Sequence, residues 1–137
     1  AASRRLRMIG RNGSARFGRV LARRPAWMKP AQSDHELRLL RALRRRGVEL
    51  DPQHPVQLPD GSTVHLDGGD PARRFGVEVD HITWHGGRLV GDYDKWRDRQ
   101  LARIGWTVPR VPDSAIDRDI ERTADELAEI YFSRAVA

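Results

Sequence analysis

The stretch VHLDGGDPARRFGVEVDHITWH, residues 64–85, decides the expected fold of this chain. Two short runs rich in Val, Leu and Phe flank a Gly-Gly-Asp-Pro turn, and this pattern predicts a β-hairpin. Side chains alternate between the two faces of a strand, so Val77 and Val79 point to one face while Glu78 and Asp80 point to the other. The valines are therefore candidates for the core, and the acids are candidates for a site.

A third acid, Asp67, ends the partner strand of this hairpin. It is placed to face Glu78 and Asp80 across the strand pair, which would gather three carboxylates in one place. Carboxylates are depleted from strands, and three like charges repel one another unless a cation holds them together. The expected cofactor is Mg²⁺ or Mn²⁺, because these ions take carboxylate and water oxygens. We therefore predict a metal site at Asp67, Glu78 and Asp80.

The length and composition of the chain limit its class. Its 137 residues make about one domain, long enough to bury a core without disulfide bonds. The absence of cysteine excludes a thiolate zinc site and fits a reducing cytosol, so we expect a cytoplasmic location. No apolar run approaches the ~20 residues of a membrane span, so we expect no membrane association. Because the sequence begins with Ala rather than Met, we expect a piece of a longer chain.

The net charge of +6 is distributed unevenly along the chain. Residues 1–32 carry nine Arg or Lys and no acid, whereas residues 33–137 carry sixteen basic and nineteen acidic side chains. A positive segment attached to a mildly acidic domain suits binding to the phosphate backbone of DNA, and a solvated basic linker is the alternative. We therefore divide the chain into a basic segment, 1–32, and a domain, 33–137. The arginines of this segment that we predict to bind DNA are Arg4, Arg5, Arg7, Arg11, Arg16 and Arg19.

A helix is expected from Ser33 to about residue 46, where a glycine follows. It starts with Ser-Asp-His-Glu, which matches the capping-box pattern ahead of an apolar run. Glu36 needs no function beyond this cap, but the helical period also puts it at the rim of the packed side, from which it could join the hairpin acids. Arg44 and Arg45 give the helix a basic end that would contact DNA.

The other elements are expected at strands 56–58 and 62–67, the hairpin strand that ends at residue 80, helix 92–104, strand 106–111 and helix 114–133. On helix 92–104, Asp94 and Asp98 are four residues apart, and Arg97 is the side chain expected to neutralise them. The order is helix, three strands, helix, strand, helix. It predicts an α/β fold in which a mixed sheet is covered by helices.

Several of these segments together resemble a known family. They are Gly-Val-Glu-Val-Asp at 76–80, Trp-His at 84–85, Asp-Lys-Trp-Arg-Asp-Arg-Gln-Leu at 94–101 and Ile-Gly-Trp-Thr-Val at 104–108. With Ser-Asp-His-Glu-Leu at 33–37 and Arg110, they resemble domain of unknown function 559. That family is similar to the very-short-patch-repair endonucleases of the PD-(D/E)XK nuclease superfamily. The resemblance implies a restriction-endonuclease-like fold over residues 33 to about 111.

The resemblance also implies roles for individual residues. Asp67 corresponds to the first metal-binding aspartate of the superfamily, and Glu78 to the acid of its Glu-x-Lys element. Asp80 stands where many nucleases have the lysine, and it matches the aspartate of a Val-Asp-Gly segment. His85 matches the histidine of a Trp-His segment, which would exchange a proton with the attacking water or the leaving oxygen. Glu36 would be the helix acid found beside such sites.

The chain departs from the family pattern at three points. His81 replaces the glycine that usually follows the aspartate, and no lysine accompanies Glu78. Two glycines follow Asp67 where the family has a larger apolar residue, so Asp70 is an alternative to Asp67. A zinc site made by His81, His85, Asp80 and His65 is a separate alternative for the metal.

Three classes of function follow from the sequence. The first is a Mg²⁺-dependent deoxyribonuclease or nickase that hydrolyses phosphodiester bonds in DNA repair or defence. The second is a DNA-binding regulator or antitoxin whose nuclease-like domain is inactive, and the third is a structural interaction domain. The expected partner is DNA, and the sequence leaves a homodimer open.

Overall fold

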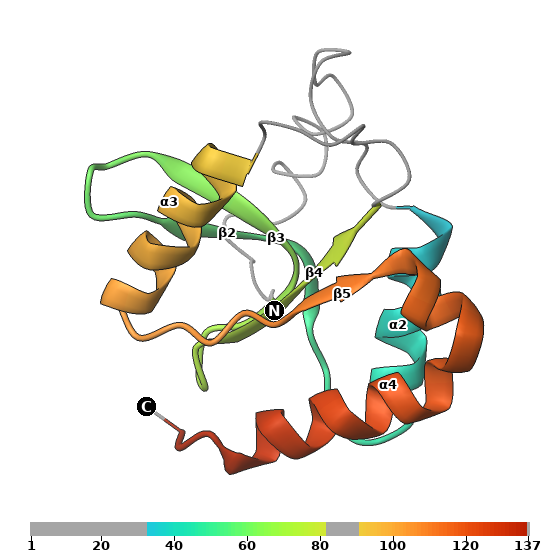
Figure 1. Cartoon of the computed structure of the whole chain (residues 1–137). Helices are drawn as coiled ribbons and strands as arrows, with labels where there is room; N and C mark the ends of the chain where they lie inside the picture. The colour runs from blue at the N-terminus through green and yellow to red at the C-terminus, as the bar shows by residue number, and fades with distance from the viewer. Residues whose placement is uncertain (1–32, 82–90, 137) are drawn as a thin grey trace, which may run out of the picture. The chain divides into compact units, whose positions relative to one another are not determined.

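A computed structural model describes residues 33–81 and 91–136 of the protein. The described residues lie in one compact unit, Gln32–Ala137, and form three helices and four strands (Figure 1). In chain order these are α2 (Asp34–Arg44), β2 (Asp51–Gln57), β3 (Thr63–Asp70), β4 (Phe75–Asp80), α3 (Gly91–Arg103), β5 (Arg110–Pro112) and α4 (Asp113–Ser133). Over the described residues this order roughly fits the predicted one, and the domain has a mixed α/β fold.

Helix α2 begins at the predicted capping box. The Ser33 hydroxyl accepts a hydrogen bond from the Glu36 amide at 3.2 Å, and the Glu36 carboxylate accepts one from the Ser33 amide at 3.0 Å. These two bonds satisfy backbone donors that have no partner inside the helix. At the other end, Gly47 adopts a φ of +83°, which glycine tolerates without strain, and the chain turns toward β2.

The four strands form one sheet in the order β2-β3-β4-β5. The first three are antiparallel neighbours, and β5 runs parallel to β4. The hairpin between β3 and β4 is longer than the sequence predicts, because Gly68 and Gly69 pair with Val77 and Gly76 inside the ladder. The predicted Gly-Gly-Asp-Pro turn is therefore wrong. The turn lies at residues 71–74, and the glycines are strand residues.

Strand β2 also differs from its prediction. It covers Asp51–Gln57, although Pro52 and Pro55 led us to expect only a short strand at 56–58. Both prolines are tolerated because β2 lies at the edge of the sheet and pairs on one side only, with β3. In contrast, β5 is shorter than the predicted strand 106–111, although Thr107 forms an isolated bridge with Phe75.

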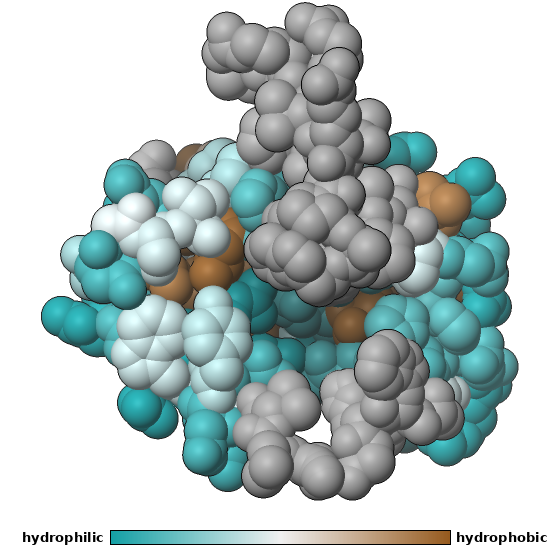
Figure 2. Space-filling model, turned by 90° about the horizontal axis from the view of Figure 1, so that it is seen from above, coloured by the Kyte–Doolittle hydropathy of each residue, from teal (hydrophilic) through white to brown (hydrophobic). Residues whose placement is uncertain are grey.

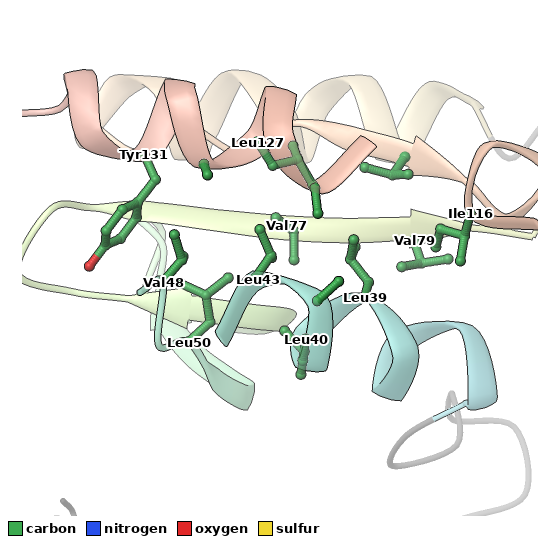
Figure 3. Close-up of a cluster of buried hydrophobic side chains, with 14 of the residues drawn as sticks. Leu39, Leu40, Leu43, Val48, Leu50, Val77, Val79, Ile116, Leu127 and Tyr131 are labelled. Carbon is green, nitrogen blue, oxygen red and sulfur yellow. The ribbon is translucent and has the colours of Figure 1, made fainter. Parts of the chain in front are cut away.

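Two clusters of buried apolar side chains hold the helices to the sheet. The larger joins α2 and α4 to β4, and Figure 3 shows Leu39, Leu43, Val77, Val79 and Leu127 converging in it. The smaller joins Leu101 of α3 to strands β2 and β3. The valines of the hairpin thus enter the core, as the alternation of the strand predicts.

Charged side chains also link α2 to α4. Arg46 binds Glu121 at 2.6 Å and Asp125 at 2.7 Å, and its side chain is largely buried. The hydrogen bonds that Arg46 donates to Glu121 and Asp125, together with the charges of these carboxylates, raise the pKa of Arg46 against the opposing effect of desolvation. Among the described side chains, the large apolar ones left exposed are Tyr93, Phe132 and Val136, and the described part of the face in Figure 2 is mainly hydrophilic.

Candidate active site

Asp67 and Glu78 are buried next to each other on the neighbouring strands β3 and β4. Their exposed fractions are 1% and 5%. The Asp67 amide donates to the Glu78 carboxylate at 3.1 Å, and the Val79 amide donates to the Asp67 carboxylate at 2.7 Å. These two hydrogen bonds, each from a backbone amide to a carboxylate, lie next to the backbone pair Gly68 and Val77 and extend the hydrogen bonding between β3 and β4. The hairpin therefore brings two of the three predicted carboxylates together.

The glycines beside this pair allow the close packing around it. A Cβ atom on Gly68 would lie 2.8 Å from Cδ2 of Leu40, so a larger residue here would force the Leu40 side chain to move. A Cβ atom on Gly76 would lie 2.6 Å from Cδ1 of Leu66 and 2.9 Å from the carbonyl oxygen of Gly68. At both positions a side chain larger than that of glycine would require neighbouring atoms to move.

Arg97 reaches the carboxylate pair from helix α3. Its Nη2 atom donates to the Glu78 carboxylate at 3.2 Å and to the His65 carbonyl at 3.3 Å, and its side chain is 9% exposed. The expectation that Arg97 neutralises Asp94 and Asp98 is wrong, because its guanidinium contacts Glu78. Arg97 therefore lies in one buried cluster with Glu78 and the neighbouring Asp67.

Asp80 has a different partner, Arg110 of strand β5. The guanidinium of Arg110 lies 2.9 Å from Asp80, 3.0 Å from Asp98 and 3.9 Å from Asp94. Burial opposes its charge, but the hydrogen bond to Asp98 and the three carboxylates outweigh that effect and raise the pKa of Arg110. Arg110 therefore takes the neutralising role that the sequence assigned to Arg97.

Glu36 is 2% exposed, and one of its oxygens accepts the capping hydrogen bond from Ser33. The other oxygen lies 4.0 Å from Nε2 of His81, the residue that directly follows β4. The contacts of Glu36 thus include both the helix cap and a residue at the end of the hairpin. The capping role of Glu36 is confirmed, and its role beside the hairpin acids stays a prediction.

His81 lies in a group that the sequence does not predict. Ligand atoms of His35, His81 and Asp113 all lie within 4.8 Å of one another. These residues come from the first turn of α2, the end of β4 and the start of α4. Within the described ranges this is the group of three His, Asp or Glu side chains whose geometry suits a metal ion. The alternative zinc site suggested by the sequence shares only His81 with it.

Arg44 and Arg45 lie at the C-terminal end of α2, eight to nine residues beyond Glu36 and therefore about 13 Å along the helix axis from it. Both side chains are exposed; Arg44 lies 3.7 Å from Glu49, and Arg45 lies 3.1 Å from Glu121. Other predicted site residues lie outside the described ranges, namely His85 and Arg4, Arg5, Arg7, Arg11, Arg16 and Arg19. Their roles stay predictions.

Sequence reasoning missed the partners of the carboxylates rather than the carboxylates themselves. Arg97 and Arg110 both belong to segments of the family resemblance, and that was the available signal. His35 also belongs to one of these segments, 33–37, but Asp113 does not, and no metal-ligand spacing along the chain connects the two residues with His81.

A comparison with solved structures finds the catalytic domain of the homing endonuclease I-Bth0305I. The match has a TM-score of 0.59 and 16% sequence identity, and it covers 74% of this chain and 97% of that domain. No protein-family model and no curated protein sequence matches the chain. The protein therefore has a nuclease-like fold, while the resemblance to domain of unknown function 559 stays a prediction. In the described ranges, no helix is both long enough and apolar enough to cross a membrane.

Proposed function

We propose that the protein is a metal-dependent endonuclease or nickase that hydrolyses phosphodiester bonds in DNA, in repair or defence. The observation that carries this proposal is the buried pair Asp67 and Glu78, which the hairpin joins by hydrogen bonds of 3.1 and 2.7 Å. Support comes from the likeness of the fold to a homing endonuclease catalytic domain. The resemblance to very-short-patch-repair endonucleases, which the sequence suggested, points to the same chemistry.

The residues of this pair fit Mg²⁺ or Mn²⁺. Both ions prefer oxygen ligands, and both side chains are carboxylates. The two carboxylates lie side by side in the interior with the cationic Arg97 on Glu78, and a divalent ion would supply a counter-charge that both could share. When bound, such an ion lowers the pKa of a coordinated water and stabilises charge on a phosphate.

The remaining residues of the proposed site act around this pair. Asp67 and Glu78 would hold the ion, and Arg97 would fix the orientation of the Glu78 carboxylate by its 3.2 Å contact. Asp80 follows Glu78 by two residues on β4, so it completes the acidic site or binds a second ion. His85 would exchange a proton with the water or the leaving oxygen, and Glu36 would assist from helix α2.

DNA is the substrate in this proposal. The predicted basic segment and the end of α2, with Arg44 and Arg45, would contact its phosphate backbone. Such contacts position the duplex and carry no sequence information. A cytoplasmic location and a homodimer are compatible with this function, and neither is required for it.

A second function is favoured by the arginines. Arg97 binds Glu78 and Arg110 binds Asp80, so guanidinium groups neutralise two of the acids that an active site would use for a metal. This arrangement suits a DNA-binding regulator or antitoxin-like protein whose nuclease-like domain is inactive. The two functions share DNA binding and differ in cleavage.

Conversion of supercoiled plasmid to nicked or linear DNA separates the two functions. The full chain is incubated with Mg²⁺ or Mn²⁺ and compared with Glu78→Gln, Asp67→Asn and the surface control Glu126→Gln. We expect cleavage by the wild type and the control, and a loss of about 100-fold or more in the two site variants, the scale of removing one preorganised electrostatic group. Binding to plasmid without cleavage by the wild type would favour the regulator, and absence of both would reject DNA as the partner.

A further inference from the structure

The cluster of His35, His81 and Asp113 has the spacing of ligands around one ion. Nδ1 of His81 lies 3.4 Å from a carboxylate oxygen of Asp113, which is longer than a good hydrogen bond. Two ligand atoms bound at ~2.0–2.1 Å to a tetrahedral ion are separated by about 3.3 Å. The rings of His35 and His81 meet edge to face, with centroids 5.7 Å apart and an interplanar angle of 70°. We infer that these three side chains form a binding site for a Zn²⁺-type transition-metal ion.

The donor set defines the class of ion. Two imidazole nitrogens and one carboxylate oxygen suit Zn²⁺, Co²⁺ or Ni²⁺, whereas Mg²⁺ prefers oxygen ligands and retains much of its water. The cluster therefore differs in chemistry from the carboxylate pair Asp67 and Glu78. A Zn²⁺-type ion would select the histidine cluster even when Mg²⁺ is in excess.

A neighbouring carboxylate, that of Asp117, supports the His35 ligand from outside, and the carboxylate of Glu36 lies near His81 at more than hydrogen-bond distance. Asp117 lies 3.1 Å from Nε2 of His35 and is itself held by Arg38 at 2.9 Å. Glu36 lies 4.0 Å from Nε2 of His81, the nitrogen opposite the one that faces Asp113. Metal-binding histidines commonly have such outer carboxylates, which fix the ring and increase its basicity.

The cluster is open enough for an ion to enter. The side chains of His35, His81 and Asp113 are 24%, 31% and 14% exposed. Three protein ligands would leave a fourth position for water, as in zinc sites with an open coordination position. Because the ligands belong to the starts of α2 and α4 and the end of β4, the bound ion would join these three elements and stabilise the folded state by mass action.

The test measures metal binding directly and does not depend on the proposed nuclease function. The full chain is freed of metal with a chelator, dialysed into buffer with excess Mg²⁺, and titrated with Co²⁺ by visible absorption and with Zn²⁺ by calorimetry. We expect one equivalent of either ion, visible bands typical of low-coordinate Co²⁺, and a rise in the midpoint of thermal unfolding with Zn²⁺. Absence of saturable binding would overturn the inference.

Variants locate the ion. His81→Gln and His35→Gln should each lower the affinity by about 100-fold or more, beyond the 10- to 100-fold typical of losing an outer partner. His54→Gln on strand β2 is the matched control and should bind like the wild type, with circular dichroism verifying that each variant is folded. Unchanged affinity in both cluster variants would overturn the assignment, as would binding that depends on His85 or Asp67 but not on His35.

Discussion

Two carboxylates of the candidate active site, those of Glu78 and Asp80, are each held by a specific arginine. Glu78 is bound by Arg97 and Asp80 by Arg110, and the two arginines come from different elements. A buried carboxylate that loses its cation is costly, because neither water nor a counter-charge replaces it. The free-energy cost of burying Glu78 and Asp80 is therefore offset by arginine side chains from outside the hairpin.

Replacement of Arg97 by methionine tests this dependence. Arg97→Met leaves Glu78 buried without its guanidinium partner, so we expect the free energy of unfolding in urea to fall by about 3–5 kcal/mol. Arg99→Met, on the exposed side of the same helix, is the control and should change it by about 0.5 kcal/mol or less. The double variant Arg97→Met with Glu78→Gln should regain part of the loss. Equal losses in Arg97→Met and Arg99→Met would show that the buried pair contributes nothing.

At the scale of elements, the hairpin β3–β4 is the part on which the site depends. Its register places Asp67 beside Glu78, and Gly68 and Gly76 leave room for the side chains of Leu40 and Leu66 around this part of the hairpin. The clash expected at Gly76 is with the backbone of the partner strand as well as with Leu66, so a side chain there would shift the strands.

Gly76→Ala should therefore be destabilising. A Cβ atom 2.9 Å from the Gly68 carbonyl oxygen cannot be accommodated by a side-chain rotation, and overpacking of this kind costs about 1–3 kcal/mol. The control is Gly91→Ala at the start of α3, where a Cβ atom meets nothing within 4 Å, and we expect a change of about 1 kcal/mol or less. Thermal unfolding of both variants makes the comparison, and equal midpoints would contradict the proposed packing.

For the whole molecule, charge is divided between the basic segment and the acidic remainder of the chain. Residues 1–32 carry nine basic side chains and no acid, whereas the acids of the candidate site all lie beyond residue 33. If DNA is the substrate, the basic segment 1–32 supplies the electrostatic attraction to phosphate groups that the acidic site cannot supply. Affinity for DNA would then depend strongly on salt, because each neutralised phosphate releases counterions.

Salt dependence of DNA binding tests that division. Simultaneous replacement of Arg4, Arg5 and Arg7 by glutamine should reduce the slope of log affinity against log salt concentration by up to about 3, since each phosphate contact contributes about 0.9. Replacement of the exposed Arg118 and Arg122 of α4 by glutamine is the control and should leave the slope unchanged. Fluorescence anisotropy with a labelled duplex measures both slopes, and identical slopes would exclude a DNA-contacting role for these three arginines.

Local signals in the sequence determined the elements of this protein. The capping box, the helical periods and the alternation in residues 75–80 are properties of neighbouring residues, so they predicted three helices, four strands and the valines of the core. The same alternation placed Glu78 near Asp67, because both belong to one hairpin. The prediction was wrong about the prolines of β2 and the glycines of β3. Whether a strand accepts proline or glycine depends on its position in the sheet, which the local sequence does not specify.

Only the tertiary structure decided which side chains meet across elements. Arg97 contacts Glu78, Arg110 contacts Asp80, and His81 lies with His35 and Asp113, and none of these contacts follows from spacing along the chain. The physical reason is that such partners are fixed by how helices pack on the sheet and in which order the strands pair. That packing is set by the summed burial of many apolar side chains. Each charged residue then pairs with whichever oppositely charged side chain the packing has brought close to it.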